Sequence, residues 1–229
     1  MKTTEFEKLT ISTSCMNRND MLVQTVPTWL KFPVKEILIV DWNSNEKVSD
    51  TLKNHNIRDE RIRIVRVDNE LFYQHSLARN LKIKEVETEW VLSVDADVKI
   101  FNSFFDNIYV LNGRKYYCLP LAGEMDSRFG TTLFRKMDYI AIGGCNTNMK
   151  GWGYEDLDLA DRMIRSGCKH LTFNKDCLFH IQHDDIRRTE NCEVKNKWES
   201  NSKNMYIGSK EDVLDFVSYN GNFKVEYVR

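Results

Sequence analysis

This sequence of 229 residues has almost no net charge, no long hydrophobic run and no closely paired cysteines. Its 33 Lys and Arg residues nearly balance 34 Asp and Glu residues, so net charge gives no reason to expect nucleic acid or an anionic membrane as a partner. The longest apolar stretches have the length of strands, which excludes a transmembrane helix. The remaining composition, 41% hydrophobic and 29% charged, is that of an ordinary globular protein.

The cysteines and the start of the chain indicate a compartment. None of the six cysteines forms a C-x-x-C pair, which argues against a zinc knuckle. Residues 1–8 are polar and lack the apolar centre of a signal peptide. We therefore expect reduced thiols and a cytoplasmic protein. The length is typical of one domain with a modest appendage.

The most informative stretch runs from Trp90 to Val98, where an apolar run ends at Asp95-Ala96-Asp97. Alternation along an extended chain places the two carboxylates on the same side. At the C-terminal end of a strand they would enter the crevice where open α/β sheets bind ligands. Two close carboxylates repel each other unless a cation or hydrogen-bond donors compensate. Mn²⁺ or Mg²⁺ holding a diphosphate is one explanation, and a strand followed by an acidic turn is the other.

Strand-like and helix-like segments alternate through the first half. Strands are predicted at 9–13, 37–40, 61–67 and 90–94, and helices at 21–30, 48–54 and 74–86. Asp20 is the expected N-cap of the first of these helices, and the alternation in 61–67 predicts one less buried face. This order predicts an open, mostly parallel sheet with helices on both faces. Polar residues follow three strands at Thr13, Asp41 and Asp95, which favours a ligand crevice at that edge.

The second half has a less regular pattern. Short β candidates are 116–119, 131–135, 139–142, 171–173 and 178–183. A helix is expected from Glu155 to a terminal glycine at Gly167. Residues 184–202 are polar and are expected to be loop or helix, and 205–229 carries no motif.

Two polar clusters in this half are candidates for chemistry. Glu155 and Asp156 suit the first turn of a helix, where acids are favourable against the helix dipole, but a carboxylate there can also act as a general base. The preceding Gly151-Trp152-Gly153 would bring backbone and an indole face close to a ligand. His180 and His183 should face opposite sides of an extended segment, so one of them, at most, would complete a metal site begun by Asp97. A lone histidine is more often a hydrogen-bonded structural residue, and that is the alternative for each of them.

Together these segments resemble the GT-A glycosyltransferases, in particular the inverting branch with family 2 enzymes, chondroitin-polymerase-like transferases and β-1,4-galactosyltransferases. The resemblance runs from about Leu9 to about Asp185 and depends on the order of its segments. These are Ile11-Ser12-Thr13 with Asn17-Arg18, Ile39-Val40-Asp41, Ala78-Arg79-Asn80, Asp95-Ala96-Asp97, Gly143-Gly144, the run from Gly151 to Leu159, and His183. It implies a single GT-A (Rossmann-like) domain over 1–204, with a nucleotide-binding half at about 9–98 and an acceptor and catalytic half at about 99–190. Residues 205–229 would be a C-terminal extension.

The resemblance implies roles for individual residues in donor and metal binding. Thr13, Arg18 and Asp41 would bind the base and ribose of the nucleotide, and Arg79 would lie near its phosphates. Asp95 and Ala96 belong to the nucleotide-sugar site, with Asp95 facing the ribose or the water shell of the metal. Asp97 would ligate Mn²⁺ or Mg²⁺ together with His183, with His180 as the second choice.

The resemblance also implies the reaction. Asp156 would be the catalytic base, Glu155 would bind the acceptor or donor sugar, and Trp152 would lie under the sugar. The implied activity is metal-dependent, inverting transfer from a UDP-sugar to a hydroxyl of a glycan or another acceptor. The chain departs from the family pattern at Tyr154, where a small residue is common, and at Cys145-Asn146, where Phe-Asp is common.

Two other functions fit parts of the sequence. A non-catalytic nucleotide-sugar-binding module would keep the fold without turnover, although both acidic pairs are intact. A phosphatase of the haloacid dehalogenase type also uses D-x-D after an apolar strand, but normally near the N-terminus and followed by Thr or Gly-Thr. Here Val98-Lys99 follows, deep in the chain.

Overall fold

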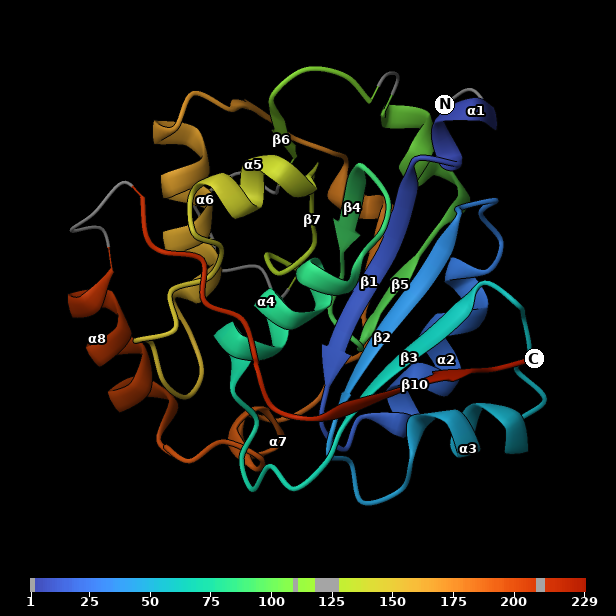
Figure 1. Ribbon diagram of the computed structural model, residues 1–229, viewed down its shortest axis with the longest axis horizontal. Coiled ribbons are helices and arrows are strands. Elements are labelled where there is room, and N and C mark those ends of the chain that lie inside the picture. The colour runs from blue at the N-terminus through green and yellow to red at the C-terminus, as the bar shows by residue number, and fades with distance from the viewer. Residues whose placement is uncertain (1–2, 109–110, 118–127, 209–212) are drawn as a thin grey trace.

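The computed structural model describes residues 3–108, 111–117, 128–208 and 213–229 (Figure 1). Its centre is an eight-stranded sheet with the order β10-β3-β2-β1-β4-β7-β6-β8. The strands are β1 Leu9–Cys15, β2 Glu36–Trp42, β3 Ile62–Val67, β4 Trp90–Ser93, β6 Lys115–Tyr117, β7 Thr132–Arg135, β8 Lys169–Leu171 and β10 Phe223–Tyr227. A separate two-stranded sheet joins β5 (Val98–Ile100) to β9 (Leu178–His180).

The sheet is parallel where the first half of the chain forms it. β1 pairs in parallel with β2 and β4, and β2 pairs in parallel with β3. β7 and β10 then join antiparallel at β4 and β3. The expected mixed, mostly parallel sheet flanked by helices is therefore confirmed.

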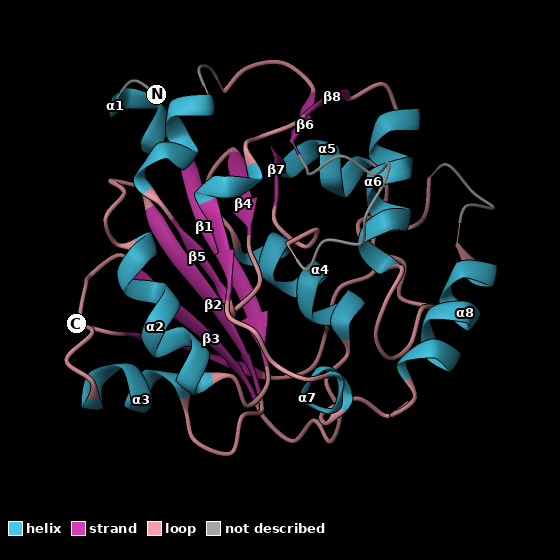
Figure 2. Cartoon of the chain, turned by 180° about the vertical axis from the view of Figure 1, so that it is seen from behind, coloured by secondary structure: helices cyan, strands magenta, loops and turns pink. Residues whose placement is uncertain are grey.

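Helices cover both faces of this sheet. The α-helices are α1 Thr3–Phe6, α2 Asn19–Trp29, α3 Val48–Asn54, α4 His75–Glu85, α5 Lys136–Ala141, α6 Glu155–Arg165, α7 Asp185–Thr189 and α8 Lys197–Ile207, with 3-10 turns at Asn102–Asn107 and Lys175–Cys177. Seen from behind, α2 and α3 lie over one face, and α4 lies over the other (Figure 2). Among the helices that the structure describes, none is long and apolar enough to cross a membrane.

The hydrophobic core divides into two clusters because neighbouring strand residues point to opposite faces. Ile39 and Leu92 belong to the cluster that contains Trp29 of α2, whereas Val40 and Val91 belong to the cluster on the α4 side. This two-sided burial explains the unbroken apolar runs of these strands.

The structure corrects several predicted elements of the first half. Helix α2 begins at Asn19 with Arg18 as its N-cap, so Asp20 lies inside the first turn and does not cap the helix. All six residues of β3 are buried, so the prediction of one less buried face is wrong. Its two arginines tolerate burial because Arg63 pairs with Glu36 at 2.5 Å and Arg66 pairs with Asp41 at 2.7 Å.

In the second half, Tyr139–Ile142 is not a strand, because α5 covers Lys136–Ala141. Tyr139 and Ile142 are buried there, and a short apolar run fits a buried helix as well as a strand. The strand candidates near 116 and 171 are shifted by one or two residues, and Leu119 lies outside the described residues. The polar stretch 184–202 contains α7 and the start of α8.

The tail without a motif has a defined place in the fold. Residues 213–222, which we call the strap, cross the α4 side of the molecule before β10 completes the sheet edge (Figure 1). Leu214 N–H donates to the Ile142 carbonyl at 3.2 Å. The ring of Phe216 contacts Tyr139, and Tyr219 packs edge-on against Trp42 with ring centroids 5.0 Å apart. The last strand is therefore part of the main sheet.

Asn80 holds this strap to the rest of the domain. Its buried Nδ2 donates to the Val217 carbonyl at 2.6 Å and to the Cys145 carbonyl at 2.9 Å. Its Oδ1 accepts from the Tyr139 hydroxyl at 2.7 Å and from the Cys145 N–H at 2.8 Å. One side chain thus joins α4, α5, the following loop and the strap.

We expect Asn80→Ala to lower the free energy of unfolding by at least about 2 kcal/mol, since it leaves several buried polar groups unpaired. Urea unfolding followed by circular dichroism measures this change. Asn54→Ala, at the exposed end of α3, is the matched control and should stay within about 0.5 kcal/mol of wild type. Equal effects of the two variants would contradict the bridging role of Asn80.

Candidate active site

A cavity of about 410 Å³ opens at the C-terminal ends of β1 and β4. Its walls come from segments far apart in the sequence. They include Ser14 and Cys15 at the end of β1, Met16 and Arg18 after it, Tyr73, His75 and Arg79 around α4, Asp95, Ala96 and Asp97, Gly130, residues 152–157, His180, and Asp185, Arg188, Asn191 and Lys197. A ligand crevice at this edge is what open α/β sheets provide.

Helix α2 fixes the loop that carries the two aspartates. The Thr25 hydroxyl donates to the Ala96 carbonyl, and the Trp29 indole N–H donates to the Val98 carbonyl, both at 2.9 Å. Both bonds are buried, so they hold the loop firmly. The result is that the carboxylates of Asp95 and Asp97 have a defined position at the end of β4.

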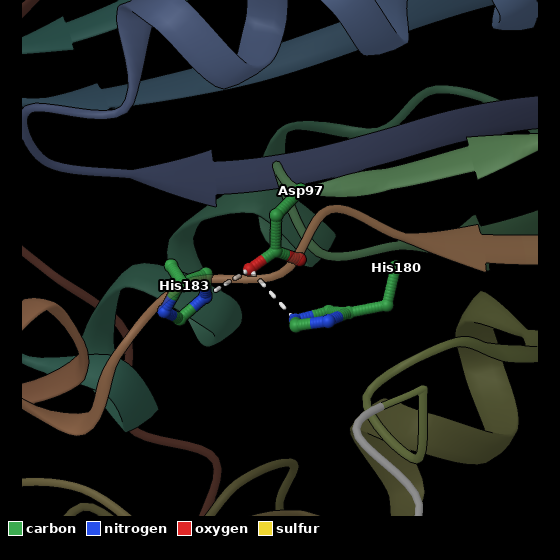
Figure 3. Close-up of side chains that lie close together, drawn as sticks. All are labelled: Asp97, His180 and His183. Atoms are coloured by element: carbon green, nitrogen blue, oxygen red, sulfur yellow. Dashed lines mark hydrogen bonds and ion pairs between the residues drawn. The ribbon is translucent and has the colours of Figure 1, made fainter.

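Asp97 meets both histidines of the late segment (Figure 3). Its Oδ2 lies 2.8 Å from His183 Nε2 and 3.4 Å from His180 Nε2. The expectation that the two histidines face opposite sides is wrong, because β9 ends at His180 and the chain no longer alternates as a strand before α7. Burial alone would raise the pKa of Asp97, but hydrogen bonds and attraction from the two imidazoles hold that pKa well below its ordinary value.

These three side chains form a candidate metal centre. One ligand atom from each lies within 4.8 Å of the other two. Asp97 Oδ1 and His180 Nδ1 are buried and have no hydrogen-bond partner among the described residues, which is unusual unless another group satisfies them. One carboxylate and two imidazoles are suitable donors for a divalent transition metal.

On another wall of the cavity, Arg79 lies between Asp95 and Glu155. Its guanidinium is 3.5 Å from Asp95 Oδ1 and 3.4 Å from Glu155 Oε1. The facing backbone is Gly130, where an added Cβ would lie only 2.0 Å from Asp95 Oδ2. A side chain at position 130 would therefore displace Asp95.

Asp156 presents a carboxylate to the cavity from the first turn of α6. Gly153 and Tyr154 precede this helix with positive φ angles of 101° and 73°, so the chain turns sharply before Glu155. Burial and the neighbouring Glu155 raise the pKa of Asp156, and Arg79 opposes them. Asp158 plays a different part, since it is buried in an ion pair with Arg162 at 2.6 Å.

The structure places most of the predicted site residues together. Arg18, Ala96 and Trp152 line the same cavity as the acids. Thr13 and Asp41 do not line it: Thr13 is fully buried in β1, and Asp41 accepts hydrogen bonds from the backbone of Ser44 and Val48 and from Arg66.

His75 also lines the cavity, although it is absent from the predicted set. It shares one face of α4 with the predicted Arg79 and with the buried Lys82, a spacing that the sequence contains. Burial and the nearby Arg79 lower the pKa of His75 to about 3 and that of Lys82 to about 7. Lys82 Nζ donates to Ser93 Oγ at 2.7 Å, directly behind the aspartate loop.

The segment 185–197 also contributes to the cavity without a recognisable motif. Arg188 and Lys197 lie 5.6 and 6.0 Å from the centre of the Trp152 ring, in the arrangement of cation–π contacts. They hold the indole at the cavity mouth. A polar stretch of sequence does not indicate such a contact, because it depends on how α7 and α8 fold back.

Two family models match consecutive parts of the chain. Residues 10–107 match "Glycosyl transferase family 2", and residues 124–184 match "N-terminal domain of galactosyltransferase". Human chondroitin sulfate synthase 3 is 36% identical over 58 residues, which are 25% of this chain and 7% of that protein. The chain thus spans a small part of the length of the curated relatives it matches.

Solved structures share the fold at low identity. The catalytic domain of Drosophila β1,4-galactosyltransferase 7 with xylobiose is 15% identical, with a TM-score of 0.58 over 84% of this chain and 78% of that one. A mutant of the same enzyme, in complex with manganese, UDP-Gal and xylobiose, has a TM-score of 0.56 at 16% identity and the same coverage. The mannosyltransferase PcManGT from Pyrobaculum calidifontis, with GDP-Man and Mn²⁺, is 13% identical, with a TM-score of 0.59 over 72% and 54%.

We expect His180→Ala and His183→Ala each to weaken Mn²⁺ binding at least about tenfold, because both rings meet the same carboxylate oxygen. Titration with Mn²⁺ followed by electron paramagnetic resonance measures the affinity. His55→Ala, at the exposed end of α3, is the control and should bind as wild type does. If only one of the two site variants loses affinity, the three-residue metal centre is wrong.

Proposed function

We propose that this chain, which belongs to the GT-A glycosyltransferases, moves a sugar from a UDP-sugar to a hydroxyl of a glycan or another acceptor, with inversion at the anomeric carbon. The observation that carries the proposal is one cavity lined both by Asp97 and His180 of the candidate metal centre and by a separate carboxylate, Asp156. The complexes of the Drosophila enzyme with UDP-Gal and manganese support a UDP-sugar as donor.

Asp97, His180 and His183 would hold Mn²⁺ or Mg²⁺, which when bound neutralises charge on the leaving diphosphate. Arg79 would steady Asp95 beside the donor, since its guanidinium contacts both Asp95 and Glu155. Arg18 would contact the nucleotide directly because it lines the cavity with Ala96. Asp41 would act through the segment after β2, because its carboxylate accepts from the backbone of Ser44 and Val48. The buried Thr13 would not contact the nucleotide directly.

Asp156 would act as the general base. Its carboxylate would take the proton of the acceptor hydroxyl while that oxygen forms a bond to the anomeric carbon. The bond from this carbon to the diphosphate breaks in the same step, and the electron pair leaves with UDP. Attack from the face opposite the leaving group inverts the configuration. Trp152 would lie under the reacting sugar, and Glu155 would bind one of the sugars.

A panel of nucleotide sugars with Mn²⁺ tests this activity by measuring UDP release with and without EDTA. We expect release from one UDP-sugar in the presence of an acceptor, and its loss on chelation. Asp156→Asn should lower the rate at least about 100-fold and leave UDP–Mn²⁺ binding nearly unchanged, because it removes only the base.

Asp161→Asn, half-exposed on the same helix, is the control for that variant and should keep full activity. Normal turnover by Asp156→Asn would disprove the base assignment. Binding of UDP–Mn²⁺ without turnover across donors and acceptors would favour the non-catalytic binding module. The two family models that match the chain describe glycosyltransferases, so they do not support the phosphatase alternative.

We also expect a distinctive pH dependence. Because burial and Glu155 raise the pKa of Asp156, kcat/KM should fall as the pH is lowered through that raised value, at a higher pH than for an ordinary aspartate. Asp156→Glu should move this acid limb. A limb caused by protonation of the metal-binding histidines would stay in place in that variant, and this result would contradict the prediction.

A further inference from the structure

Strand β10 is one of the two edge strands of the main sheet as the structure describes it. It pairs antiparallel with β3 in an unbroken register from Phe223 opposite Val67 to Tyr227 opposite Arg63. Val228 N–H donates to the Ile62 carbonyl at 3.3 Å, so the peptide groups of Val228 point toward β3. Alternation then directs those of Lys224 and Glu226 toward β3, and those of Phe223, Val225 and Tyr227 outward.

This outer edge is open. In the part of the chain that the structure describes, no strand follows β10 in the sheet order. The side chains of Val225 and Tyr227 are 44% and 47% exposed. Natural proteins usually cover or interrupt an edge of this kind, because unpaired peptide groups can join another strand. The five residues of β10 contain no proline that would interrupt it.

The sequence of β10 is complementary to itself in one antiparallel register. With Val225 opposite its own copy, Lys224 lies opposite Glu226, and Phe223 lies opposite Tyr227. A register centred on Lys224 would put two lysines together, and one centred on Glu226 would put two glutamates together. Only the Val225-centred register among these three pairs opposite charges, and it also uses all three outward residues for hydrogen bonds.

We propose that β10 is a dimer interface at which two copies of this chain pair antiparallel about Val225. The two eight-stranded sheets would then form one continuous sheet across a two-fold axis. Lys224 is available for this contact, since its side chain is 72% exposed and its ion pair with Asp68 spans 3.4 Å. Glu226 is 24% exposed and would keep its contacts with Ser49 and Lys47 while facing Lys224 of the other copy. Strands β3, β2 and β1 separate β10 from β4, where the cavity lies. The cavity of each copy would therefore stay open in the dimer.

Sedimentation velocity of the full chain tests the proposal through Val225→Pro. Proline removes the outward N–H at the centre of the interface, while the bonds to β3 come from the neighbouring residues and remain. We expect the wild-type chain to dimerise at a concentration on the order of 100 µM, and the variant to dimerise at least about tenfold more weakly. A monomeric wild type, or a variant that dimerises equally well, would overturn the proposal.

A charge exchange tests the register and does not depend on proline. Lys224→Glu alone and Glu226→Lys alone each place like charges opposite one another twice in a homodimer, so each should dimerise more weakly than wild type. In a 1:1 mixture of the two variants, position 224 of each copy again lies opposite a residue of opposite charge at position 226 of the other copy. We therefore expect a heterodimer. Failure of the mixture to associate, with both variants folded by circular dichroism, would show that this register is wrong.

Discussion

The arrangement of the site depends on the partly buried guanidinium of Arg79. Asp95, Glu155 and Asp156 converge on one cavity, and carboxylates so close repel each other unless a cation lies among them. Arg79 supplies that charge from α4 and contacts acids from two other elements, the loop after β4 and the start of α6. The pKa of Arg79 is raised because, although burial acts to lower it, Glu155 and Asp95 more than compensate. The cation is therefore permanent, and the loop after β4 and the start of α6 meet at it.

The remaining scaffold keeps the parts around Arg79 in place. The hydroxyl of Thr25 and the indole of Trp29 hold the aspartate loop from α2. Asn80, the next residue after Arg79, connects the same helix to the strap. Asp97 faces away from Arg79 toward the two histidines, so the acids of the loop are compensated by different partners. This separation leaves Asp156 as the acid whose raised pKa suits proton transfer.

The sequence predicted the parts of this arrangement that local patterns encode. Strands β1 to β4 and helix α6 follow from apolar runs, alternation and an acidic helix start, and the order of the motifs indicated the GT-A fold. The errors come from contacts between distant residues. The burial of Arg63 depends on Glu36, and the shared approach of His180 and His183 to Asp97 depends on where β9 ends. The pairing of β10 with β3 joins Tyr227 to Arg63, and no short window contains it.

That pairing has a consequence for how the chain is made. β3 lies in the first third of the sequence. Its antiparallel neighbour β10 becomes available only after residues 223–227 have been synthesised and have left the ribosome. Until then, that side of β3 must remain without this partner in the nascent protein. Contacts so distant along the chain also slow folding. The nascent domain would therefore carry an unpaired edge at β3 for most of its synthesis. A chaperone that covers this edge would be most valuable in that period.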